Sequence, residues 1–79
     1  MKTDMEKKVE QHMRDITNIF PGKLLLDKKE LSQLRGDSLS TINREIENGE
    51  GIPYKKQKGK VKYPIREVAI WLSQIAKTA

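Results

Sequence analysis

Five lysines gather in one short segment of the chain, and their spacing suits binding of a polyanion. They occur within eight residues with no acidic residue between them: Lys55, Lys56, Lys58, Lys60 and Lys62. Their summed charge equals the net charge of the whole protein, which is +5. A concentrated positive segment favours nucleic acid because each lysine can displace a cation condensed on the phosphates. The same pattern is also typical of a solvated edge hairpin that resists aggregation.

A second set of polar residues, just before the lysines, has the types that recognise DNA bases. At 100° per residue, Leu39, Ile42 and Ile46 form a buried stripe on a helix. This leaves Ser40, Thr41, Arg44 and Asn48 facing away, with Asn43 and Glu47 at the flanks. Arginine can bond both guanine acceptors in the major groove, and asparagine can pair with adenine. The outer face of a helix is polar in any protein. A lysine-rich segment beside this one favours DNA binding, with the helix contacting base edges and the lysines contacting phosphates.

Hydrophobic periodicity and capping residues predict the helices and the strand that precede the lysines. Residues 3–20 are expected to form an amphipathic helix, with Thr3 and Glu6 spaced as a capping box and Pro21-Gly22 as its end. A short strand is expected over residues 23–26. The next helix begins at Asp27, with Glu30 at the capping-box position, and ends at Gly36. The third begins at Ser38 and ends at Asn48-Gly49.

The last third of the chain reads as a hairpin followed by a helix. Alternation on both sides of residues 57–59 predicts a β-hairpin, with Val61 and Tyr63 against the core and Lys60 and Lys62 outward. Pro64 is expected in the first turn of the last helix. The apolar face of that helix consists of Ile65, Val68, Leu72, Ile75 and Ala76. Ile70 points elsewhere, and the N-terminal helix is expected to cover it, from the same chain or from a second subunit.

Together these elements predict an α+β fold of order α-β-α-α-β-β-α: a winged helix-turn-helix with an extra N-terminal helix. Residues 1–22 form the N-terminal amphipathic helix, for packing or dimerisation, and residues 23–79 form the DNA-binding domain. A chain of 79 residues has room for one small domain. It has no Cys and no apolar run long enough to cross a bilayer, so we expect a soluble, cytoplasmic protein.

The run from Leu24 to Leu72 resembles a known family, the small winged helix-turn-helix proteins of the MerR-like superfamily, especially excisionases and short prophage regulators. The similar stretches are LLLDKKELSQLRG, SLSTINREIENGEGIP and KGKVKYPIREVAIWL. The resemblance implies duplex binding by Ser38, Ser40, Thr41 and Arg44, with the lysines of the wing on phosphates. Position 37, usually apolar in the family, is Asp37, so Leu39 is expected to fill the inner side of the turn.

The function expected from the sequence is therefore sequence-specific binding of double-stranded DNA, as an excisionase-like recombination directionality factor or a small transcriptional regulator. The expected partners are duplex DNA and either a second copy on an adjacent site or a recombinase, with no membrane and no small-molecule effector. No catalytic residues, cofactor or metal are expected, since His12 is the only histidine and no nucleophile and base can be singled out. The alternative is a protein-interaction module whose N-terminal helix and basic wing hold an acidic partner.

Overall fold

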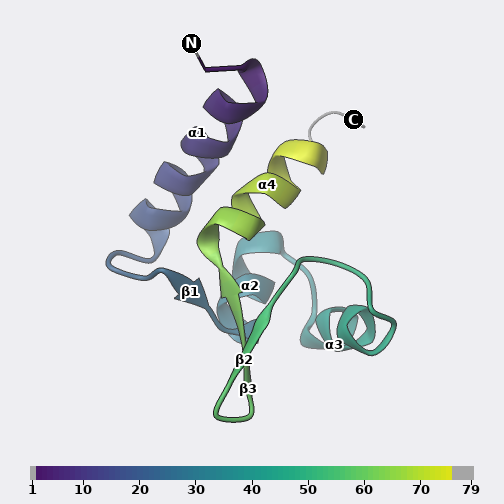
Figure 1. Cartoon of the computed structure of the whole chain (residues 1–79). Helices are drawn as coiled ribbons and strands as arrows, with labels where there is room; N and C mark the ends of the chain where they lie inside the picture. The colour runs from purple at the N-terminus through teal and green to yellow at the C-terminus, as the bar shows by residue number, and fades with distance from the viewer. Residues whose placement is uncertain (1, 76–79) are drawn as a thin grey trace.

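A computed structural model describes residues 2–75, which form an α+β fold of four helices and a three-stranded antiparallel sheet (Figure 1). The order of elements is the predicted one. The helices are α1 (Asp4–Ile19), α2 (Lys28–Arg35), α3 (Leu39–Glu47) and α4 (Ile65–Ile75), and the strands are β1 (Leu25–Leu26), β2 (Lys55–Gln57) and β3 (Lys60–Pro64). Ala76 and the side chain of Ile75, both predicted on the apolar face of α4, lie outside the described residues.

Helix α1 packs along α4, so the N-terminal segment belongs to the same core as the rest of the chain. Its cap is partly the predicted one: the hydroxyl of Thr3 accepts a hydrogen bond from the backbone N–H of Glu6 at 3.1 Å. The reciprocal bond of a capping box is absent among the described residues. The predicted amphipathic character of this helix is confirmed, with Val9 and Ile16 buried and Met5, Met13 and Phe20 partly buried against the core.

The sheet has the order β1-β3-β2, so β3 lies in the middle and joins the hairpin to the body of the protein. Val61 and Tyr63 are buried as predicted, because alternate residues of β3 face the core. Strand β1 pairs Leu25 with Pro64 and Leu26 with Tyr63. It is shorter than the predicted strand, and the side chain of Leu24 is 77% exposed.

The junction between β3 and α4 differs from the prediction. Pro64 ends the strand instead of entering the helix, and α4 begins at Ile65. The reason is that sheet pairing continues through the junction, where the N–H of Ile65 donates to the carbonyl of Leu24 at 3.0 Å. Within α4, Val68 and Ala69 are fully buried, since this helix contacts α1 on one side and β3 on the other.

Across the described residues, no helix is both long enough and apolar enough to cross a membrane.

Candidate functional site

Helices α2 and α3 are held in place by side-chain caps that the sequence predicts. The carboxylate of Asp27 accepts from the N–H of Glu30 at 2.7 Å, and the carboxylate of Glu30 accepts from the N–H of Asp27 at 3.0 Å. Gly36 ends α2 in the left-handed conformation. At the start of α3, the hydroxyl of Ser38 accepts from the N–H of Thr41 at 3.2 Å. These caps satisfy backbone donors that have no partner within the helices.

The predicted base-reading residues fall into two groups on α3. Ser38 and Thr41 share a hydrogen bond between their hydroxyls at 3.1 Å, and Thr41 is half-buried. Ser40, Asn43 and Arg44 are exposed and, together with exposed Glu47, make up the outer face of α3. Ser38 and Thr41 therefore hold the start of the helix, whereas the side chains of the outer face are exposed.

Leu39 does not occupy the position that the sequence predicts. It was expected in the buried stripe and on the inner side of the turn, but its side chain is 45% exposed. Ile42 is fully buried and Ile46 partly buried, as predicted. The remaining inward position is taken by Glu45, which lies one turn beyond Ile42. Helix α3 is thus rotated from the predicted orientation, so that Leu39 turns outward and Glu45 turns inward.

We attribute this rotation to an ion pair between α2 and α3. The guanidinium of Arg35 donates to both carboxylate oxygens of Glu45, at 2.9 and 2.7 Å. It also contacts Asp37 at 2.8 Å and lies 4.3 Å from the centre of the Trp71 ring. The side chain of Arg35 is 5% exposed. Asp37, at the position where the resemblance predicts an apolar residue, is therefore a second partner of Arg35.

The same pair shifts the ionisation of both residues. The hydrogen bonds from Arg35 hold the pKa of Glu45 below its ordinary value of 4.5, against the opposing effect of burial. The pKa of Arg35 is correspondingly raised by its bonds to Glu45. Sequence analysis missed this pair, although a signal was present. Arg35 lies four residues after Leu31 and Glu45 three residues after Ile42, both spacings that place a side chain on the buried side of a helix.

The five lysines lie where the sequence predicts, on the hairpin of β2 and β3, and we call residues 55–62 the lysine hairpin. The register pairs Lys55 with Lys62, Lys56 with Val61 and Gln57 with Lys60. Directly opposite residues share a face, so Lys55, Lys60 and Lys62 lie on the face away from Val61. The turn places Lys58 and Gly59 at positive φ, 52° and 78°, which is typical of a two-residue hairpin turn.

The charges of the lysine hairpin have no acidic partner among residues 2–75. In the part of the chain that the structure describes, none of the ion pairs involves these lysines. Lys55 stands directly opposite Lys62, and like charges in that position destabilise a strand pair. A bound polyanion would relieve this repulsion.

An open depression connects the hairpin with α3. It has a volume of about 380 Å³ and is lined by residues from three elements, among them Lys28 and Lys29 of α2, Leu39 and Asn43 of α3 and Lys60 of β3. Of the predicted DNA-binding residues, the structure therefore brings Asn43 and Lys60 together at one site. Figure 1 shows α3 and the hairpin at the same end of the molecule, with α1 and the end of α4 at the other.

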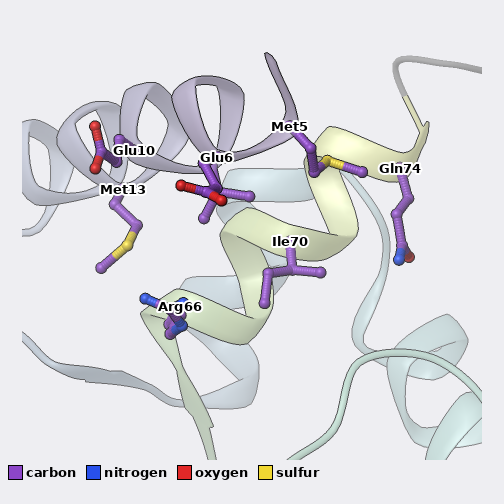
Figure 2. A pocket seen from close by; sticks show the side chains of 8 residues that line it. Met5, Glu6, Glu10, Met13, Arg66, Ile70 and Gln74 are labelled. Atoms are coloured by element: carbon purple, nitrogen blue, oxygen red, sulfur yellow. The ribbon is translucent and has the colours of Figure 1, made fainter. Parts of the chain in front are cut away.

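A second groove lies between α1 and α4. Figure 2 shows the side chains that line it. Those from α1 include Met5, Glu6, Glu10 and Met13, and those from α4 are Arg66, Ile70 and Gln74. Its volume is about 420 Å³. Ile70 is half-buried here, so α1 covers it from within the chain, as one of the two predicted arrangements requires.

Comparison of the chain with family profiles, with curated proteins and with solved structures finds no match.

Proposed function

We propose that this chain is a winged helix-turn-helix protein that binds double-stranded DNA. In this proposal α3 enters the major groove, and the lysine hairpin is the wing that contacts the phosphates. The protein acts as an excisionase-like recombination factor or a small transcriptional regulator. A single small module buries little surface, so tight binding requires a second copy on an adjacent site or a partner protein such as a recombinase.

The observation that carries the proposal is the position of the hairpin lysines, which form no ion pair with any residue that the structure describes, beside the outer face of α3. Lys60 and Asn43 line one depression, so a cation suited to phosphate and an amide suited to a base edge share one surface. The sheet order β1-β3-β2 supports the proposal as well, because it attaches the hairpin to the helical body through β3. Arg44 is exposed on the same helix and has the donors to read guanine.

The test is a salt titration of duplex binding, first on random DNA and then on duplexes selected from a random pool. If three to five lysines contact phosphates, log affinity falls against log salt with a slope of roughly −3 to −4.5. Replacing Lys60 and Lys62 with Gln should make the slope shallower by about 1.8, at 0.9 per phosphate contact. Lys7→Gln with Lys8→Gln on α1 is the matched control, since it removes the same charge from exposed positions on another element.

Arg44→Ala separates base reading from phosphate binding. It should cost on the order of 1 to 3 kcal/mol on the selected duplex and little on random DNA. Equal losses on both would make Arg44 a phosphate contact. A salt-independent affinity, or equal effects of the hairpin and α1 variants, would contradict the proposal itself.

The groove between α1 and α4 favours a second candidate function, a protein-interaction module. Met5 and Met13 line it together with Ile70, and methionine side chains adapt to different partners. In this alternative α1 and the lysine hairpin hold an acidic protein. Retention on heparin and on duplex DNA without sequence preference at any salt concentration would favour it over the first proposal.

A further inference from the structure

Leu39 is an apolar side chain exposed on the helix that faces the candidate ligand. It lies in the first turn of α3 with 45% of its surface exposed. A single exposed leucine is ordinary on a protein surface. Leu39 differs because it lines the depression between α2, α3 and the hairpin, which three lysines also line.

Asn43 stands one helical turn after Leu39 and lines the same depression. Residues four apart lie on one face of a helix, so the two side chains form one continuous surface. The amide of Asn43 makes no hydrogen bond to any other described residue. It therefore presents a free donor and a free acceptor next to an apolar group.

This combination matches the edge of one kind of base pair. In the major groove, adenine offers the N7 acceptor and the N6 donor, which an asparagine amide pairs with bidentately. Thymine offers a C5-methyl group, which apolar side chains contact. Guanine and cytosine have no methyl group there, so Leu39 would lose its contact against a G·C pair.

Lysines from two elements line the depression together with Leu39 and Asn43, and they can hold the phosphates that flank a groove. Lys28 and Lys29 come from the start of α2 and Lys60 from β3, so the cations approach the depression from two different elements. The one acidic residue that lines it, Asp27, has its carboxylate bonded to the N–H of Glu30. That carboxylate caps α2, and its charge is outnumbered by the three lysines.

We propose that Leu39 and Asn43 read A·T base pairs in the major groove, with Leu39 on the thymine methyl group and Asn43 on adenine, while Lys28, Lys29 and Lys60 bind the flanking phosphates. The proposal rests on duplex binding by α3 and names the bases that this helix recognises. It adds Leu39, Lys28 and Lys29 to the residues that contact DNA.

Modified duplexes test the base assignment directly. Duplexes selected by the full chain should contain A·T pairs at a defined position. Replacing each thymine there by deoxyuridine removes only the methyl group and should weaken binding about fourfold. Leu39→Ala should bind the thymine and deoxyuridine duplexes equally. Leu24→Ala is the matched control, because Leu24 is also exposed but lies outside the depression, and this variant should keep the fourfold preference.

The adenine contact has its own test. Replacing adenine by 7-deazaadenine removes the N7 acceptor and should weaken wild-type binding on the order of tenfold, whereas Asn43→Ala should no longer distinguish the two duplexes. Lys28→Gln with Lys29→Gln should weaken all duplexes alike and reduce the salt slope by about 1.8. Circular dichroism of each variant checks that these substitutions leave the fold intact.

The outcomes separate this inference from the proposed function. Selected duplexes without a required A·T pair, or a Leu39→Ala variant that keeps the preference for thymine over deoxyuridine, would overturn the inference while salt-dependent, sequence-specific binding remained. Absence of duplex binding at low salt would overturn both.

Discussion

The guanidinium of Arg35 and the carboxylate of Glu45 form a two-point hydrogen-bonded ion pair, at 2.9 and 2.7 Å, that ties α2 to α3. Because Arg35 is almost fully buried and stacks on Trp71, the pair also connects α3 with α4. It sets the rotation of α3, and with it the residues that α3 presents outward. The arrangement of the candidate site therefore depends on a contact that lies on the opposite side of the helix.

Removing the carboxylate should destabilise the protein strongly. Glu45→Ala leaves a buried guanidinium with Asp37 as its remaining carboxylate partner, and breaking a buried pair in this way costs about 3 kcal/mol. Urea denaturation followed by circular dichroism measures the change. Glu10→Ala, which breaks the exposed pair with Lys2, is the control and should change little. If Glu45→Ala lowered the free energy of unfolding no more than Glu10→Ala does, the pair of Arg35 and Glu45 would not stabilise the fold.

The pair should also make stability depend on pH in acid. The carboxyl of Glu45 keeps its charge in the folded protein to a pH below its ordinary pKa of 4.5, so the unfolded chain binds more protons in that window. Its contribution to the free energy of unfolding is therefore complete well above pH 4.5 and is lost as the pH falls through the lowered pKa. Comparing the pH dependence of wild type and Glu45→Gln isolates this group. If the free energies of unfolding of the two proteins ran parallel between neutral pH and strong acid, Glu45 would not contribute to the pH dependence of stability.

Gly51 supports the pair from the connection between α3 and β2. Its φ is 85°, and a Cβ atom there would lie 2.5 Å from Oε1 of Glu45. Gly51→Ala should therefore combine backbone strain with displacement of Glu45 from Arg35, costing about 2 to 4 kcal/mol. Gly49→Ala is the matched control, with φ 68° and open space around its Cβ, and should cost only the strain of about 1 kcal/mol.

A double variant tests the mechanism of the Gly51 effect. If the added methyl group acts through Glu45, the excess of Gly51→Ala over Gly49→Ala should disappear when Glu45 is already Ala. An undiminished excess in that background would assign the effect to another contact.

Helix α1 should behave as part of the core. Ile16 is 1% exposed, so Ile16→Ala should cost about 2 to 5 kcal/mol. Ile19 is one turn further along and 57% exposed, and Ile19→Ala should change stability by less than about 0.5 kcal/mol. Thermal denaturation of the two variants in parallel gives the comparison. Similar melting temperatures for the two variants would mean that α1 does not pack on α4 in solution.

Local signals in the sequence determined most of the fold. Thr3, Asp27 and Ser38 cap the helices at which they were expected, since capping involves residues only three positions apart. Alternation along residues 60–63 predicted which side chains of the hairpin face the core, and Val61 and Tyr63 are buried. The same alternation predicted the hairpin itself, and the five lysines belong to that segment of the sequence.

Tertiary structure alone decided how α3 is turned. Periodicity treats a glutamate as an outward residue and a leucine as an inward one, and here Glu45 and Leu39 exchange those roles. The exchange requires Arg35 of α2 to be buried beside Trp71 of α4, and no local pattern brings three separate helices together. A buried charge must find its partner across the fold because leaving it unpaired costs several kcal/mol, about as much as a small domain has to spare.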